Sequence, residues 1–151
     1  MSYRYFGPAL LALFLCGSHS MTAADYSPRQ YYGGWQRNQQ AGYHYRSYYY
    51  KPNPSYRGYK HHYVVWSPTS RQHYYFYNPY TKKYWGRCPV YHEGNGGYSR
   101  LEPDYQRGKL SEIKESAFPS PSDPPGIPES NDGVPLDLPP DDLPEAEHPA
   151  P

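Results

Sequence analysis

Histidine is the residue type in this sequence best suited to hold a metal ion or to move protons. His61 and His62 are adjacent, and His44, His73 and His92 stand apart from them. Neighbouring residues on a strand point to opposite faces of a sheet. No His-x-His, His-x3-His or Cys-x2-Cys spacing, of the kind that zinc sites use, accompanies the pair. We therefore predict exposed strand histidines, no metal site and no cofactor.

A nucleophile with a supporting base is the other arrangement that would indicate catalysis. The sequence has no Gly-x-Ser-x-Gly turn, and its acidic residues are concentrated near the carboxyl terminus, so Ser-His-Asp chemistry has no supporting motif. The aliphatic side chains of residues 59–101 are Val64, Val65, Val90 and Leu101 alone. So few leave little volume for an enclosed cleft, and we predict that the protein is not an enzyme.

Aromatic and cationic side chains supply the most informative chemistry. The 151-residue chain has 21 Tyr, 3 Trp and 4 Phe, and ring faces stack on sugars, bases or other rings while Arg adds cation–π contacts. Strand alternation would place Tyr75 and Tyr77 on one face and keep Trp85 and Arg87 together on one face. We take these four residues as a candidate binding platform. The alternative is that the chain itself covers these rings, with the amino-terminal segment or the tail.

The amino terminus has the pattern of a secretory signal peptide. Arg4 precedes an apolar run of 8 residues, from Ala9 to Cys16, and small residues follow up to Ala24. The run is too short to span a bilayer, which takes roughly 20 residues. We predict removal of residues 1–24, export to the periplasm, envelope or exterior, and no membrane-spanning segment in the mature chain.

Cys88 would be the one cysteine left after this processing. It could not form a disulfide within the chain. In an oxidising compartment such a thiol is either buried as a small apolar group or paired between chains. Both alternatives stay open, and the second predicts a disulfide-linked dimer.

Residues 59–101 have the strongest strand pattern. Aromatic and β-branched runs at 59–66, 72–77, 83–87 and 98–101 are separated by turns rich in Pro, Asn and Gly. This spacing predicts a small all-β fold, an antiparallel meander of three to four strands. Tyr, Trp and Phe must provide most of its core, since each ring can bury about 150–250 Å².

The segments on either side of this meander have different compositions. Residues 25–58 are rich in Tyr and Gly with Ala41 as their sole aliphatic side chain, and are predicted to be a low-complexity segment without a core. Residues 102–118 are predicted to form a short helix or a linker, with Leu110, Ile113 and Ala117 on one helical face. Residues 119–151 contain 11 prolines with acids between them, which predicts a disordered, extended acidic tail.

Charge divides the chain in two. Residues 25–110 hold 13 Lys and Arg against 4 Asp and Glu (+9), whereas residues 111–151 hold 10 acids against one Lys (−9). A basic body followed by an acidic tail predicts either contact between the two or two surfaces with different partners.

The whole layout resembles a group of small, Tyr-rich exported proteins of planctomycete-type bacteria. After the signal peptide, the resemblance rests on six short motifs: Tyr48–Pro52 (YYYKP), Tyr59–Tyr63 (YKHHY), Tyr75–Pro79 (YFYNP), Lys83–Arg87 (KYWGR), Tyr98–Leu101 (YSRL) and Ile127–Ser130 (IPES). The group has no assigned activity, so the resemblance implies compartment and architecture alone.

A second resemblance covers residues 66–89. Tyr74-Tyr75, Asn78, Thr81, Trp85 and Pro89 are similar to the Tyr-Tyr, Asn, Thr, Trp and Pro pattern of a WW domain. WW domains hold proline-rich ligands in an aromatic groove. The resemblance implies a three-stranded meander with Tyr75 and Trp85 as groove residues, and the proline-rich tail would be a ready ligand within the same chain.

These observations predict an exported, non-enzymatic interaction or structural protein of the envelope or the extracellular space. Its Tyr- and Trp-rich basic surface would associate with an envelope polymer or a protein surface. The alternatives are a carbohydrate-binding module that uses the four platform residues, and a WW-like binder of proline-rich segments. Export argues against nucleic acid as a partner.

Overall fold

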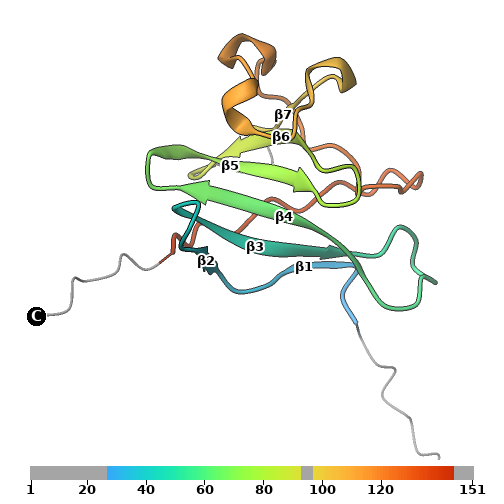
Figure 1. Ribbon diagram of the computed structural model, residues 1–151. Coiled ribbons are helices and arrows are strands. Elements are labelled where there is room, and N and C mark those ends of the chain that lie inside the picture. Colours follow the sequence, from blue (N-terminus) through green and yellow to red (C-terminus); the bar gives the residue numbers. More distant parts are fainter. Residues whose placement is uncertain (1–26, 93–96, 145–151) are drawn as a thin grey trace, which may run out of the picture.

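The computed structural model describes residues 27–92 and 97–144 of the 151-residue chain (Figure 1). The predicted signal peptide and its cleavage site lie outside these residues. The described chain forms one antiparallel sheet, which confirms the predicted all-β fold class. Its strands are β1 (Gln30–Tyr32), β2 (Gln36–Asn38), β3 (Tyr43–Tyr50), β4 (Lys60–Ser67), β5 (Ser70–Asn78), β6 (Lys83–Pro89) and β7 (Ser99–Arg100).

The sheet is a meander whose four long strands follow one another in sequence. The order across it is β1-β3-β4-β5-β6-β7, and β2 pairs with the other half of β3. The β5–β6 turn forms as the sequence predicts: Asn78 Oδ1 accepts hydrogen bonds from the backbone N–H groups of Tyr80 (2.9 Å) and Thr81 (3.3 Å).

Residues 27–58 do not form the coreless segment that we predicted. They supply three strands, and the side chains of Tyr48 and Tyr50 on β3 are fully buried. The prediction was wrong because it counted aliphatic residues. In this protein alternating tyrosines bury one face of a strand in the same way as valine or leucine would.

The prediction of a disordered tail was also wrong for residues 119–144. They lie against the sheet, and Figure 1 shows them (orange to red) passing behind the strands, where Ile127, Leu136 and Pro139 are buried. Ion pairs join the tail to the body, with N–O distances of 2.8 Å for Arg29–Asp132 and 2.6 Å for Arg46–Asp142. The basic body and the acidic tail are therefore in contact with each other, which is one of the two arrangements that the charge pattern predicts.

Residues 102–118 contain three 3-10 turns and no α-helix: η1 (Pro103–Tyr105), η2 (Leu110–Glu112) and η3 (Glu115–Ala117). Leu110 and Ile113 still pack together against the sheet, as the predicted helical face would have done. The described residues include no helix with the length and apolar character needed to cross a membrane.

Each face of the sheet therefore has its own cluster of packed rings. The face covered by the tail, called the tail face here, carries the larger core, which includes Tyr48, Tyr50, Trp66, Tyr74, Phe76, Cys88 and Tyr98 together with Ile127 and Leu136. The opposite face, called the tyrosine face, is covered by residues 102–118 at its β5–β6 side alone, where Leu110, Ile113 and Phe118 meet Val65, Tyr75 and Tyr84.

Candidate binding surface

A β-bulge at Trp85 separates the four residues of the predicted platform. In the register between β5 and β6, Phe76 pairs with Gly86 and Tyr77 pairs with Tyr84, which leaves Trp85 as an extra residue. Tyr84 consequently packs on the tyrosine face, whereas Trp85 packs on the tail face. Sequence alternation placed Trp85 on the same face as Arg87, and this prediction was wrong.

Two further platform residues are closed off by residues 102–118. Tyr75 is 8% exposed and Arg87 is 9% exposed. Arg87 Nη1 donates to a Glu115 carboxylate oxygen at 2.9 Å, and the guanidinium lies 4.0 Å from the centre of the Phe118 ring. This pair holds the pKa of Glu115 below its ordinary value. Arg87 and Tyr75 thus fasten the 3-10 segment to the sheet, and Tyr77 alone of the four stays half-exposed on the open part of the face.

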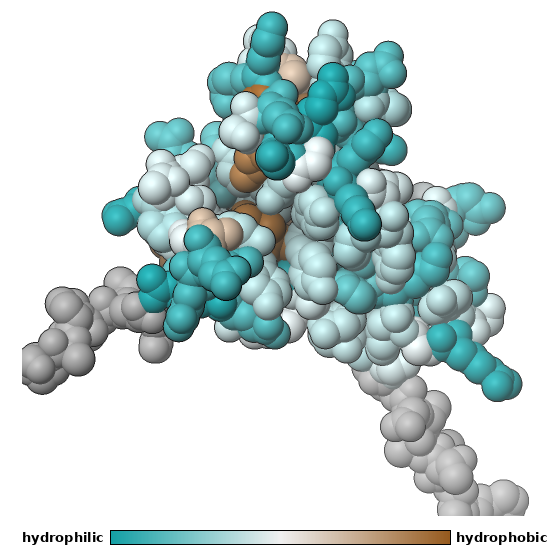
Figure 2. Space-filling view, viewed as in Figure 1, coloured by the Kyte–Doolittle hydropathy of each residue, from teal (hydrophilic) through white to brown (hydrophobic). Residues whose placement is uncertain are grey.

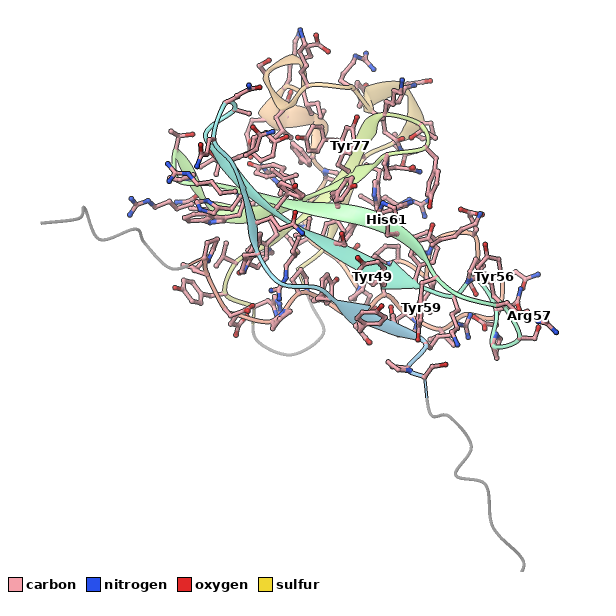
Figure 3. The ribbon with its side chains drawn as sticks, turned by 60° about the horizontal axis from the view of Figure 1, so that its bottom comes forward. Tyr49, Tyr56, Arg57, Tyr59, His61 and Tyr77 are labelled. Atoms are coloured by element: carbon pink, nitrogen blue, oxygen red, sulfur yellow. The ribbon has the colours of Figure 1, made fainter. Side chains whose placement is uncertain are left out.

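The open part of the tyrosine face is a continuous array of half-exposed rings. Cross-strand register aligns Tyr31, Tyr49 and His61, and the next row contains Tyr63 and Tyr77. Figure 3 shows Tyr49, His61 and Tyr77 on successive strands β3, β4 and β5.

Short distances between ring centres join this array. Tyr31 stacks on Tyr49 at 4.8 Å, His61 lies 6.0 Å from Tyr49 and 5.2 Å from Tyr63, and Tyr63 meets Tyr45 edge-on at 5.6 Å. The rings therefore support one another in fixed positions while their outer sides stay open to solvent.

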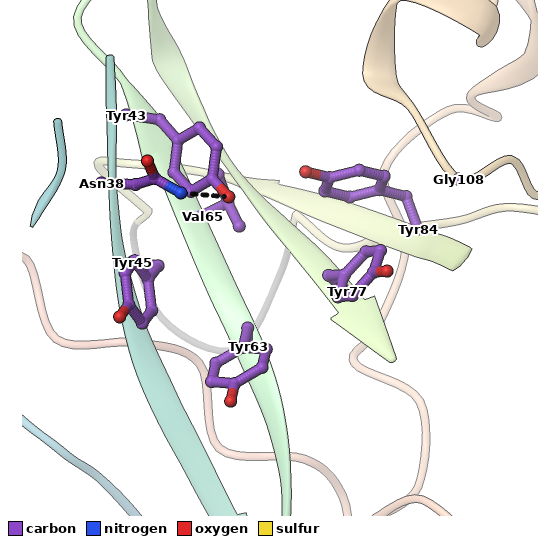
Figure 4. A pocket seen from close by; sticks show the side chains of 8 residues that line it. All are labelled: Asn38, Tyr43, Tyr45, Tyr63, Val65, Tyr77, Tyr84 and Gly108. Atoms are coloured by element: carbon purple, nitrogen blue, oxygen red, sulfur yellow. Dashed lines mark hydrogen bonds between the residues drawn. The ribbon is translucent and has the colours of Figure 1, made fainter. Parts of the chain in front are cut away.

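A hollow of about 360 Å³ lies where this array meets residues 102–118 (Figure 4). Its lining is Asn38, Tyr43, Tyr45, Tyr63, Val65, Tyr77, Tyr84 and Gly108. Asn38 Nδ2 donates to the Tyr43 hydroxyl at 3.3 Å. Burial raises the pKa of Tyr84 to about 12, and tyrosine hydroxyls are neutral at pH 7 even at their ordinary pKa of about 10. The walls are thus neutral rings carrying hydroxyl and amide groups, which is a lining suited to a polar ligand with a flat apolar side.

Two cations adjoin in sequence the Gly108 that lines the hollow. Arg107 and Lys109 flank Gly108 in sequence, and both are exposed. Figure 2 shows the corresponding side of the molecule as mostly pale or hydrophilic residues around a narrow apolar strip below the 3-10 turns. The described acids of the tail that form ion pairs do so with Arg29, Arg46, Lys60 and His92, away from this hollow.

The two adjacent histidines point to opposite faces, as predicted. His61 contacts tyrosines of the tyrosine face, whereas His62 packs beside Tyr50 and Trp85 on the tail face. His62 is 3% exposed, which corrects the expectation of an exposed histidine, and burial lowers its pKa to about 4. Within residues 27–92 and 97–144, no three His, Cys, Asp or Glu side chains lie close enough together to hold a metal ion.

Cys88 is a free thiol and is fully buried on the tail face. Burial raises the pKa of this thiol well above its ordinary value. Of the two alternatives drawn from the sequence, the buried apolar group is the one that this fold contains. A disulfide to a second chain would first require the tail to leave the sheet.

The residues of the ring array that the sequence analysis missed lie mainly on β3. Tyr43, Tyr45 and Tyr49 belong to the segment that we predict to be low-complexity. Their odd-numbered spacing in the run YHYRSYYY is the signal that would have placed them on one face of a strand. For Trp85, the signal is Gly86, because a glycine inside a strand often marks a bulge.

No protein-family model matches the chain, and no curated protein or solved structure matches it either. The resemblance to Tyr-rich exported proteins stays a prediction. The groove implied by the WW resemblance does not form from Tyr75 and Trp85, because these rings lie on opposite faces of the sheet.

Proposed function

We propose that the mature chain is an exported, non-enzymatic binding protein that associates with an envelope polymer or a protein surface through its tyrosine face. The observation that carries this proposal is the array of half-exposed rings from Tyr31 to Tyr77, held in two adjacent rows by the register of neighbouring strands. Export is supported by the signal-peptide pattern of residues 1–24.

Rigid rings are well suited to this role. Tyrosine offers a large contact area and loses little conformational entropy on binding, since it has two side-chain torsions. In this protein the contacts within the array restrict those torsions before any ligand arrives. A patch of fixed rings favours ligands that present repeated flat surfaces, such as polymers.

Carbohydrate binding is the second candidate, and the hollow beside the array favours it. Its volume of about 360 Å³ lies at the small end of the range of about 300–1,000 Å³ typical of ligand pockets. Tyrosine faces can stack on a sugar ring, while the Asn38 amide and the tyrosine hydroxyls can exchange hydrogen bonds with sugar hydroxyls.

The test compares retention of three mature proteins on isolated envelope and on a glycan array: the intact chain, Tyr63→Ala and Tyr105→Ala. Tyr63 lies in the array and lines the hollow, whereas Tyr105 is exposed on η1, away from both. Loss of one stacking ring is expected to weaken binding by about 1–3 kcal/mol. Equal retention of all three proteins would contradict the proposal, and retention on envelope without any glycan signal would remove the carbohydrate candidate alone.

A further inference from the structure

The end of the described tail lies in a groove of the tail face that is built from aromatic side chains. We call residues 134–144 (VPLDLPPDDLP) the proline segment. Gln30 Nε2 donates to the Pro135 carbonyl at 2.9 Å, Tyr32 Oη to the Asp137 carbonyl at 2.6 Å, and Trp35 Nε1 to the Asp142 carbonyl at 2.8 Å. Three side chains of β1 and the loop after it thus bind three backbone carbonyls of the segment.

These contacts have the form of polyproline recognition. A proline-rich strand makes no internal hydrogen bonds, so its carbonyls are free to accept from a partner. Domains that bind such strands use aromatic grooves. Here Leu136 and Pro139 are buried as apolar anchors among the rings of the tail face, while Trp35 and Tyr32 donate beside them.

Charge adds selectivity for an acidic strand. Arg46 is 5% exposed, and its Nε donates to the Gly33 carbonyl at 2.8 Å. Its guanidinium lies 4.8 Å from the centre of the Trp35 ring, and Nη1 meets Asp142 Oδ1 at 2.6 Å. The sheet therefore holds a buried cation in place at the end of the groove, where a carboxylate of the bound segment neutralises it.

We propose that this groove is a binding site for acidic, proline-rich segments, filled within the chain by residues 134–144 and, between molecules, by the same segment of a second copy. Every copy carries both halves, since residues 25–110 have a charge of +9 and residues 111–151, which contain the segment, have a charge of −9. Reciprocal exchange of tails between two copies gives a closed, domain-swapped dimer, whereas one-way insertion of each tail into the next copy builds an open chain. A tethered segment has an effective concentration in the millimolar range, so exchange requires crowding, as on a polymer surface.

The first test uses the full mature chain and a fluorescent peptide with the sequence of residues 134–144. The full-chain variant Asp142→Asn weakens the binding of the internal segment to the groove and leaves the residues of the groove unchanged. It should bind the peptide about tenfold more tightly than the wild type, the effect expected for one charge-assisted hydrogen bond. The control Asp123→Asn makes the same change at an exposed tail position outside the segment and should bind like the wild type.

A peptide of the same composition in scrambled order separates groove binding from charge attraction. The proposal predicts that it binds at least tenfold more weakly to Asp142→Asn than the native sequence does. Equal binding of the two peptides, or no gain in Asp142→Asn over Asp123→Asn, would overturn the proposal.

The second test needs no variant that could fail to fold. Excess unlabelled native peptide added to the isotope-labelled wild-type chain should move the NMR signals of the chain's own Leu136 methyl groups to those of a solvent-exposed leucine, because the peptide displaces the buried internal segment. Mixed preparations carrying donor and acceptor dyes should then show energy transfer between copies that rises with protein concentration and falls when free peptide is added. Unchanged Leu136 signals at a large excess of peptide overturn the groove assignment, and a monomer at every concentration overturns exchange between copies.

Discussion

Gly86 lies at the β-bulge that sets which face of the sheet each ring of β6 points to. Gly86 directly follows the extra residue Trp85, and its partner across the sheet is Phe76. The Tyr98 ring occupies the space where a side chain at this position would lie, with ring carbons 2.6 Å from the position of an added Cβ. A residue without a side chain is thus required where the bulge returns the strand to the sheet.

We predict that Gly86→Ala destabilises the fold by about 1–3 kcal/mol, the usual effect of overfilling a packed core. Tyr98 is fully buried and packs against the rings of Phe76 and Trp85, so its ring can move only by displacing them. Urea unfolding followed by tryptophan fluorescence measures the change. Gly34→Ala is the matched control, since no atom lies within 4 Å of an added Cβ there. Equal stability of the two variants would show that Tyr98 does not depend on Gly86.

The buried His62 gives the stability of the fold a pH dependence. Its pKa is about 4 in the folded chain because of burial, against about 6.5 when unfolded. The unfolded state therefore binds more protons between these values, and stability falls as the pH drops from 6.5 to 4. Above pH 6.5 this contribution is constant.

We predict that His62→Gln flattens this part of the stability profile, by up to about 3 kcal/mol between pH 6.5 and pH 4. Urea midpoints measured at half-unit pH steps give the two slopes. Hydrogen bonds to Arg29 and Ser130 lower the pKa of Asp132 to about 2. Its contribution to stability is therefore lost only below pH 4, outside the range in which His62 titrates. Identical slopes for the variant and the wild type would contradict the assignment to His62. His61→Gln, on the opposite face, is the control and should keep the wild-type slope.

At the scale of elements, the tail behaves as a part of the core although it forms no long strand. Ile127 and Leu136 are each 2% exposed, and both belong to the ring cluster of the tail face. We predict that Leu136→Ala costs about 2–5 kcal/mol, as for other buried leucines. It should also make the tail sensitive to limited proteolysis. Val134→Ala, two residues away and 36% exposed, is the control. A tail equally resistant in both variants would contradict its role in the core.

The hairpins of β4 to β7 could be predicted because their signals are local. Alternating rings define the strands, and the Asn78 side chain that closes the β5–β6 turn lies within three residues of its partners. The position of β3 could not be recognised from aliphatic content, since the pairs Tyr45–Val65 and Ser47–Tyr63 become visible only once β4 is beside it. The tail depends on partners more than 100 residues away, such as Gln30 for Pro135. Composition, which favoured disorder, carries no information about such partners.

The candidate site likewise contains residues that could be predicted from the sequence and residues that could not. Tyr77 was found because it lies in the predicted meander, whereas Trp85 was placed on the wrong face because one bulge reverses the alternation after it. Arg87 has the chemistry of a binding residue, but Glu115 and Phe118 use it within the chain. Sequence can identify side chains that are able to bind; it cannot identify those that the fold itself has already engaged.

At the scale of the whole molecule, the fold separates the charges. The acidic tail pairs with cations of the tail face, among them Arg29 and Arg46. Arg107 and Lys109 are exposed and adjoin in sequence Gly108, which lines the hollow of the tyrosine face. The chain as a whole is nearly neutral, with a formal net charge of +1, and these two cations lie in the segment that borders the open rings.

We predict from this separation that retention on an anionic polymer has two parts, one sensitive to salt and one dependent on rings. Lys109→Gln should lower retention at about 0.05 M salt and have no effect at about 0.5 M, where the Debye length is only a few ångströms. Tyr63→Ala should lower retention at both salt concentrations, because stacking is not screened. Arg100→Gln removes the same charge from exposed β7, whose partner Gly86 faces the tail side, and should leave retention unchanged at both. Equal loss for Lys109→Gln and Arg100→Gln would mean that net charge, and not its position beside the rings, attracts the polymer.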